Sequence, residues 1–318
     1  MALSSRAAGP RASGMLLLLA VASCSRASLY PVTGGPTLDA GGDAGGGDGS
    51  TMPASCSSTV LPPGDTTRTV QVGSVARSYV LHVPATYDGK TPVPLVVDFH
   101  GIGETGSTEL ASSPYPAHLD PEGVVMAFPD GLKGPVGTDW NVGPCCVGDV
   151  DDVAFARAVV ANIQTIACVD PTRVYATGVL TGGGMAHYLA CHAADVFAAA
   201  APAAFDLLQE NVGECAPQRA VTVISFRGTA DSRVPYDGGP SSLVPGMPIT
   251  FLGAVGTFNA WSQIDRCTGS PSQEDANGCA HYSGCQDGVE VILCTKAGGH
   301  EDPGDPSIAW PVLKRHKL

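Results

Sequence analysis

The chain has 318 residues, of which 44% are hydrophobic and 15% are charged, so it can form one large domain with a buried core and a short appendage. Its net charge of −13 argues against a nucleic-acid partner, because binding to phosphates requires a basic surface. The 40 glycines and 26 prolines predict many loops and a flexible segment.

The N-terminal residues have the pattern of an export signal. Arg6 and Arg11 precede an apolar run at residues 15–22, which is too short to span a bilayer. The run ends in Val-Ala-Ser-Cys at residues 21–24, which resembles the lipobox of bacterial lipoproteins. This resemblance predicts a signal peptide at residues 1–23 and a lipid anchor on Cys24, which would hold the protein in the membrane of the cell envelope. The alternative is an ordinary signal peptide, an incidental Cys24 and release outside the cell.

The cysteine count supports export. Without Cys24, ten of the 11 cysteines remain, enough for five disulfides in an oxidising compartment. A zinc site is the rival interpretation, but the chain has no C-x2-C pair and no histidine at ligand-like spacing, so no metal is expected. Spacing leaves the pairing open, although four cysteines lie close together and are expected to pair among themselves: Cys267, Cys279, Cys285 and Cys294.

Residues 24–55 are predicted to form a tether and residues 56–318 a folded domain. Residues 33–54 are rich in Gly and Asp and offer almost nothing to bury, which is typical of a flexible linker. The run faintly resembles calcium-binding repeats, but it lacks their fixed period.

The domain alternates strand and helix patterns. Residues 69–72 and 79–83 alternate apolar and polar side chains around Gly73-Ser74, as a β-hairpin does. Further strands are predicted at residues 94–99, 124–128, 173–177, 220–226 and 289–294, and helices at 153–166, 182–193 and 309–317. Asp149, Asp151 and Asp152 precede the first helix and are expected to cap it rather than to bind a metal. This order predicts an α/β fold with a mainly parallel sheet.

The most informative segment is the strand, turn and helix at residues 174–191. Gly178 and Gly182 flank the turn as they do in Gly-x-Ser-x-Gly, the nucleophile elbow, but Leu180 occupies the position of the serine. The central residue of an elbow has a positive φ, which costs a leucine about 1–2 kcal/mol. One expectation is therefore that the turn has relaxed. Thr181 is a weak substitute nucleophile, because its side chain leaves the turn in another direction.

Three other predicted strand ends carry polar or glycine-rich turns. His100-Gly101-Ile102-Gly103 follows one strand, and a turn of this kind can direct N–H groups at an oxyanion. Asp231 follows a second strand, and Gly298-Gly299-His300 follows a third. The order elbow, Asp, His is that of α/β-hydrolase triads.

From about Arg77 onwards the chain resembles the secreted polyhydroxybutyrate depolymerase and feruloyl esterase family of α/β-hydrolases, which includes acetyl xylan esterase relatives. The matching stretches are residues 77–84, 94–101, 128–131, 140–141, 145–146, 149–153, 168–178, 228–236 and 298–300. The resemblance implies a disulfide-stabilised α/β-hydrolase fold, no cofactor, and Ser-His-Asp cleavage of esters on a polysaccharide or of a polyester.

The resemblance also implies roles for individual residues. Asp231 matches the triad acid, His300 the triad base and Leu180 the lost serine. The oxyanion hole would use backbone N–H groups of Thr181 and of Ile102 or Gly103. The alternatives are that Asp231 is an ordinary turn residue and that His300 is an ordinary loop residue, neither with a catalytic role.

Other residues have open or divergent interpretations. Trp140 either lines the substrate cleft or packs in the core, and His100 is expected to pack the oxyanion turn. The chain departs from the family at Arg227, where the family has His, and at Gly184, where it has Met. Residues 301–302 are Glu-Asp, where an aromatic or apolar residue is common.

Leu180 offers no nucleophilic oxygen or sulfur, so the sequence predicts an esterase-like protein with little or no turnover. The alternative is a non-catalytic, surface-displayed relative that binds a polysaccharide or polyester.

Overall fold

The computed structural model describes Cys56, residues 61–300 and residues 304–318. The predictions for residues 1–23, for Cys24 and for nearly all of residues 24–55 lie outside these residues and stay predictions. Among the described helices, none is long and apolar enough to cross a membrane.

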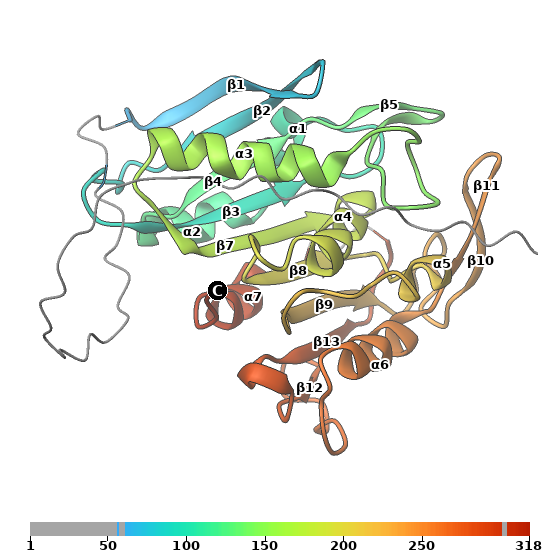
Figure 1. Cartoon of the computed structure of the whole chain (residues 1–318). Coiled ribbons are helices and arrows are strands. Elements are labelled where there is room, and N and C mark those ends of the chain that lie inside the picture. The colour runs from blue at the N-terminus through green and yellow to red at the C-terminus, as the bar shows by residue number, and fades with distance from the viewer. Residues whose placement is uncertain (1–55, 57–60, 301–303) are drawn as a thin grey trace, which may run out of the picture. The chain divides into compact units, whose positions relative to one another are not determined.

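The described residues form a nine-stranded sheet in the order β1-β2-β4-β3-β7-β8-β9-β13-β12 (Figure 1). Its strands are β1 (Gly64–Val72), β2 (Val75–Val83), β3 (Val93–Phe99), β4 (Val125–Pro129), β7 (Val169–Val179), β8 (Ala199–Ala203), β9 (Thr222–Gly228), β12 (Cys279–Tyr282) and β13 (Val291–Lys296). The six strands from β4 to β13 in this order run parallel, while the β1–β2 hairpin and β12 are antiparallel edges. The predicted hairpin and mainly parallel sheet are confirmed.

Helices cover both faces of the sheet. They are α1 (Gly106–Ser112), α2 (Tyr115–Leu119), α3 (Asp152–Ile166), α4 (Thr181–His192), α5 (Gln209–Val212), α6 (Ala254–Ile264) and α7 (Pro306–Leu313), with 3-10 turns η1 (Asp120–Glu122) and η2 (Gln286–Gly288). In Figure 1, α3, α4 and α6 lie in front of the sheet, and α1, α2 and α7 lie behind it. Each face has its own apolar core, with Phe155 and Trp261 in one and Tyr115 and Trp310 in the other.

Two small hairpins lie beyond the carboxyl ends of the parallel strands, together with α5 (Figure 1). They are β5 (Leu132–Gly134) with β6 (Gly137–Asp139), and β10 (Gly239–Val244) with β11 (Met247–Phe251). In open α/β sheets this edge is where ligands bind. The hairpins therefore flank the candidate site.

The acidic residues before α3 have separate structural roles. Asp151 is the N-cap, and its carboxylate accepts a hydrogen bond from the Ala154 N–H at 2.8 Å. Asp152 is the first residue of α3 and forms a buried ion pair with Arg77 at 2.8 Å, which joins α3 to β2; the expectation that Asp152 caps the helix is wrong. No group of side chains suited to a metal ion occurs in the part of the chain that the structure describes.

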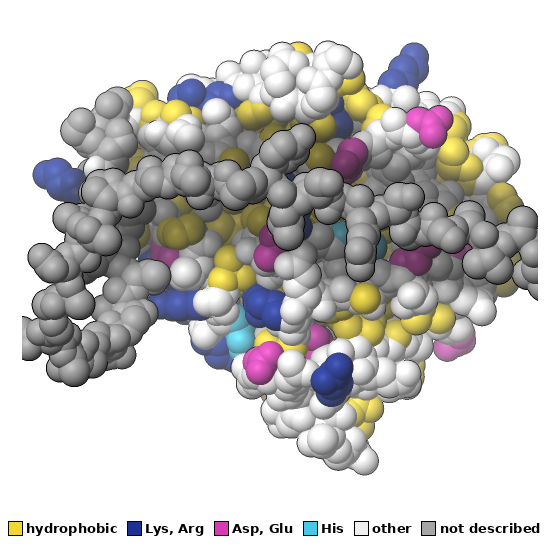
Figure 2. Space-filling view, viewed as in Figure 1, with side chains coloured by type: hydrophobic (Ala, Val, Ile, Leu, Met, Phe, Trp, Pro, Cys, Tyr) yellow, Lys and Arg dark blue, Asp and Glu magenta, His cyan; other side chains and the backbone are white. Residues whose placement is uncertain are grey.

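Ten cysteines form five disulfides: Cys56–Cys168, Cys145–Cys146, Cys191–Cys215, Cys267–Cys285 and Cys279–Cys294. The last two pairs confirm that the four C-terminal cysteines pair among themselves. On the face drawn in Figure 2, acidic, basic and apolar side chains of the described residues are interspersed. Both charge signs therefore share this surface, although the whole chain is acidic.

Candidate active site

The turn between β7 and α4 keeps the conformation of a nucleophile elbow. Leu180 has φ 56° and ψ −126°, in a region that residues with a Cβ rarely occupy. Its N–H donates to the Ala203 carbonyl at 3.1 Å, and its carbonyl accepts from the Gly184 N–H at 3.1 Å. The expectation that the turn has relaxed is wrong, because both backbone bonds hold it in place.

Glycines explain how the elbow fits between three strands. A Cβ on Gly178 would clash with the Gly182 carbonyl, and a Cβ on Gly182 would clash with the Phe99 carbonyl at the end of β3. A Cβ on Gly183 would clash with the Ala203 carbonyl of β8. The start of α4 can therefore approach both neighbouring strands only because these positions lack side chains.

The half-buried Leu180 side chain lies against the turn that follows β3. A Cβ built on Gly101 would be 2.8 Å from Leu180 Cδ1 and 3.3 Å from Glu104 Oε2. Glu104 Oε2 also accepts a hydrogen bond from the Gly101 N–H at 3.0 Å. The centre of the site thus presents an aliphatic side chain with a carboxylate beside it.

Thr181 is fully buried. Its hydroxyl oxygen is buried and makes no hydrogen bond with any described residue. A hydroxyl in this position is turned away from solvent. Its placement therefore argues against Thr181 as a substitute nucleophile.

Asp231 and His300 meet at the carboxyl edge of the sheet, after β9 and β13. His300 Nδ1 lies 2.8 Å from Asp231 Oδ2, and both residues are buried. Asp231 Oδ1 accepts from the N–H groups of Arg233 and Val234, each at 2.9 Å. An Nδ1–H bonded to the carboxylate leaves Nε2 as the nitrogen that can accept a proton. The pair has the geometry expected of a triad acid and base.

The close approach of the β13 loop depends on Gly228. A Cβ there would be 2.5 Å from the carbonyl oxygens of both Gly298 and Gly299. The glycine in the 228–231 turn therefore allows His300 to reach Asp231.

Arg227 lies behind this pair as a buried cation. Its Nη1 is 2.7 Å from Asp206 Oδ2, and its Nη2 is 3.9 Å from Asp231 Oδ2. Nη2 also donates to the Val234 carbonyl at 2.6 Å. Burial raises the pKa of Asp206 to about 7, although the Arg227 charge opposes this. Arg227 thus links the Asp231 turn to the loop after β8.

The predicted oxyanion hole is only partly available. The Gly103 N–H donates to the Thr138 carbonyl at 2.8 Å, so Gly103 is a wrong prediction. Thr181 is the first residue of α4, and its N–H has no acceptor within the helix. Among the described residues, the Ile102 N–H has no backbone acceptor either. Ile102 and Thr181 therefore remain the candidate donors.

The structure decides between the two interpretations of Trp140. Its side chain is fully buried, its Nε1–H donates to the His100 carbonyl at 2.8 Å, and its ring lies 4.7 Å from the His100 ring. Trp140 packs in the core, so a place in the substrate cleft is a wrong prediction.

His100 is structural, as expected. Its Nδ1 bonds to the Gly101 carbonyl at 2.7 Å, and its Nε2 accepts from the Gly131 N–H at 2.9 Å. Burial lowers the pKa of His100, which favours this neutral form. The ring therefore fixes the turn that faces Leu180.

The absence of a side chain at Gly184 leaves room for a neighbouring aromatic ring. A Cβ at this position would be 2.7 Å from the ring of Phe205. The Phe205 ring is buried and packs edge-on against Phe251 at 5.0 Å. An aromatic ring from the loop after β8 thus fills the space beside α4.

Comparisons with known proteins point to one group of enzymes. No protein-family profile matches the chain. Over 246 residues it is 44% identical to feruloyl esterase B of Piromyces equi, covering 76% of this chain and 46% of that protein. Over 182 residues it is 36% identical to NocK of Nocardia uniformis subsp. tsuyamanensis, a protein named as a candidate esterase. This match covers 54% of this chain and 50% of NocK. The chain thus spans about half the length of these relatives.

Solved structures agree on the fold. Acetyl xylan esterase from Aspergillus awamori superimposes with a TM-score of 0.58 at 15% identity, covering 78% of this chain and 99% of that one. A thermostable esterase gives a TM-score of 0.51 at 16% identity, covering 80% and 63%. Together with the sheet order, these matches show an α/β-hydrolase fold and support membership of the feruloyl esterase and polyhydroxybutyrate depolymerase family.

Proposed function

We propose that this chain binds ester-bearing plant polysaccharide at an esterase site and hydrolyses it slowly or not at all. The observation that carries the proposal is Leu180 at the centre of a turn with elbow conformation, in a chain that also has the hydrogen-bonded Asp231–His300 pair at the carboxyl edge of the sheet. The proposed roles are an acid for Asp231, a base for His300 and oxyanion donors for the Ile102 and Thr181 N–H groups, while the nucleophile position at Leu180 carries no hydroxyl or thiol that could form an acyl intermediate. The similarity to a feruloyl esterase favours an aromatic ester on polysaccharide over a polyester.

The size of the expected loss follows from triad chemistry. Removing the nucleophile of a serine hydrolase typically lowers kcat by about 10⁶-fold, and the remaining rate comes from binding and the oxyanion hole. Direct activation of water by His300 is the residual route. It lacks the covalent step, so it would be slow.

Restoring the serine tests the proposal. Methyl ferulate and p-nitrophenyl acetate would be assayed with the wild type, Leu180→Ser, Leu180→Ala and the double variant Leu180→Ser/His300→Ala. We expect the wild type and Leu180→Ala at the buffer rate, Leu180→Ser at least 10³-fold faster, and the double variant slow again. Wild-type turnover at ordinary enzyme rates of about 1 s⁻¹ or more would overturn the proposal. An inactive but folded Leu180→Ser would overturn the idea that only the nucleophile is missing.

A non-catalytic binding protein is the second candidate, favoured by the same Leu180. Its signature is saturable binding of an ester-bearing polysaccharide or polyester with no release of acid, measured by calorimetry and by titration of protons. Measurable turnover that is lost in His300→Ala would favour the slow esterase instead.

We also propose export and lipid anchoring through Cys24, followed by a tether at residues 24–55. The five disulfides support an oxidising compartment. Labelling with radioactive palmitate in a bacterial host should mark the wild type but not Cys24→Ser. Equal labelling of the two, or none of either, would refute the anchor.

A further inference from the structure

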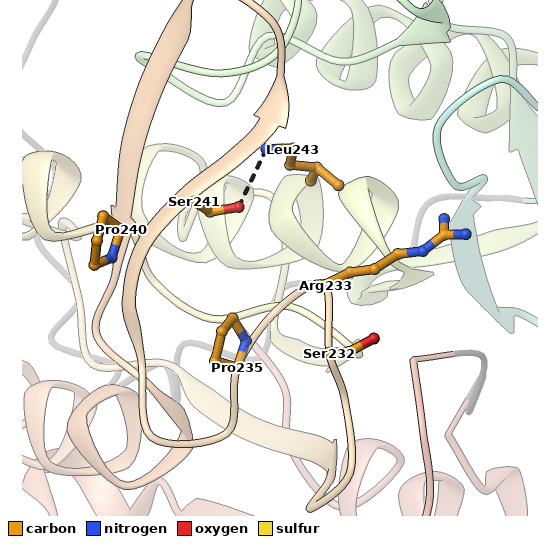
Figure 3. A pocket seen from close by; sticks show the side chains of 6 residues that line it. All are labelled: Ser232, Arg233, Pro235, Pro240, Ser241 and Leu243. Carbon is orange, nitrogen blue, oxygen red and sulfur yellow. Dashed lines mark hydrogen bonds between the residues drawn. The ribbon is translucent and has the colours of Figure 1, made fainter.

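A cavity of about 310 Å³ opens beside the candidate site, at the low end of the usual range for ligand pockets. Figure 3 shows the residues that line it: Ser232, Arg233, Pro235, Pro240, Ser241 and Leu243. The first three come from the turn that directly follows Asp231, and the others from strand β10. The cavity therefore lies between the Asp231 turn and the β10–β11 hairpin.

One wall of the cavity is the turn at residues 232–235, which is held by hydrogen bonds to Asp231 and Arg227. Asp231 Oδ1 accepts from the N–H of Arg233 at 2.9 Å, while its other oxygen bonds to His300. The Val234 carbonyl accepts from buried Arg227 at 2.6 Å. A ligand in this cavity would thus contact the same turn that orients His300.

The second wall is also anchored. Val244, Ile249 and Phe251 of the β10–β11 hairpin are buried, and the Leu243 N–H donates to Ser241 Oγ at 3.2 Å (Figure 3). The hairpin therefore has its own packed base, although it lies beyond the central sheet.

Arg233 gives the cavity its charge. Five arginines of the described part pair with carboxylates, whereas Arg68, Arg219, Arg233 and Arg266 have no ion pair with a described residue; the five are Arg77, Arg157, Arg173, Arg227 and Arg315. Arg233 is exposed, it has no ion pair with any residue that the structure describes, and none of the described lining residues is acidic. Figure 3 shows its side chain extended, with the guanidinium directed away from Pro235 and Pro240. A guanidinium in this setting favours a planar carboxylate, which it can bind through two parallel hydrogen bonds.

The remaining lining narrows the ligand further. Pro235, Pro240 and Leu243 offer apolar faces, and Ser232 and Ser241 offer hydroxyls. None of the described lining residues is aromatic, so none of them stacks on a feruloyl ring. A sugar ring has apolar C–H faces and a hydroxyl edge that match these groups. We propose that the cavity is a subsite for a uronic acid residue of the polysaccharide, with the sugar carboxylate on Arg233. This inference rests on the proposed function and names the class of polysaccharide.

Binding by calorimetry tests the subsite without requiring turnover. The probes are a xylo-oligosaccharide with one glucuronic acid substituent, the neutral oligosaccharide of the same length, and free ferulate. The variants are Arg233→Gln, Arg233→Lys and the charge-matched control Arg266→Gln, whose side chain is exposed near the end of α6.

We expect the wild type and Arg266→Gln to bind the acidic oligosaccharide about fivefold to tenfold more tightly than the neutral one. Arg233→Gln should remove this preference, Arg233→Lys should keep part of it, and 0.5 M salt should weaken it because the pair is exposed.

An acidic preference that survives Arg233→Gln would overturn the subsite while leaving the proposed function intact. Ferulate that competes with the acidic oligosaccharide only when Arg233 is present would reassign the cavity to the acyl acid. If neither oligosaccharide binds, the subsite fails, and the esterase ancestry is then judged separately by the Leu180→Ser rate on methyl ferulate.

Discussion

The strain at Leu180 can be measured by comparing two truncations. Leu180→Ala and Leu180→Gly both remove the aliphatic contact with Gly101, so that loss cancels between them. The two variants differ only in the Cβ, which is strained at φ 56° and ψ −126°. The difference in their free energies of unfolding therefore reports the strain of the elbow.

The magnitude follows from two opposing effects. Removing the Cβ from a left-handed position relieves about 1–2 kcal/mol. Glycine also increases the entropy of the unfolded chain, which costs about 0.4–1 kcal/mol. We expect Leu180→Gly to be more stable than Leu180→Ala by about 1 kcal/mol. The usual sign is the opposite, because glycine inside a helix is about 1 kcal/mol less stable than alanine.

Urea denaturation with intact disulfides gives both free energies of unfolding. Ala161→Gly is the control, because Ala161 is exposed within helix α3 and should lose about 1 kcal/mol. If Leu180→Gly is less stable than Leu180→Ala by the same amount as this control, the elbow is unstrained and the reasoning fails.

Two further predictions concern packing and pH. Gly184→Ala should destabilise the protein by about 1–3 kcal/mol, because the added methyl would lie 2.7 Å from the Phe205 ring. This loss of stability, measured by urea denaturation, should be smaller in a Phe205→Leu background. Equal losses in the two backgrounds would contradict the prediction. Burial, followed by the Asp98 and Glu104 charges, raises the pKa of Glu109 to about 9, so its contribution to stability is complete below about pH 4.5 and is lost as the pH rises towards 9. The melting temperature should therefore fall between pH 5 and pH 8.5, and fall less in Glu109→Gln; a rise over this interval would refute the assignment.

Local patterns in the sequence predict the elements that the site depends on. The β1–β2 hairpin follows from alternation around Gly73-Ser74, and Asp151 is recognisable as a helix cap. Asp231 and His300 are separated by 69 residues, yet both follow parallel strands, whose carboxyl ends share one edge. The topology of the sheet therefore predicts their meeting.

Long-range contacts decide the features that the sequence does not reveal. Strand β8 reads Ala-Ala-Ala-Pro-Ala and has no strand propensity of its own; it is extended because it pairs with β7 and β9. Gly103 loses its N–H to the Thr138 carbonyl in the β5–β6 hairpin, which is absent from the predicted elements. Trp140 could face a cleft or the core until the position of His100 is known.

The elbow survives at Leu180 because neighbouring backbones require it. The glycines around the turn contact carbonyl groups of Phe99 and Ala203, so the start of α4 is packed against β3 and β8 whatever side chain occupies the centre. Relaxing the turn would break these contacts and the Leu180 N–H bond to Ala203, at a net cost of about 1 kcal/mol for the hydrogen bond alone. That cost is comparable to the strain of a leucine with positive φ. The turn can therefore keep the elbow conformation with a leucine at its centre, which is why the single substitution Leu180→Ser is expected to give esterase activity.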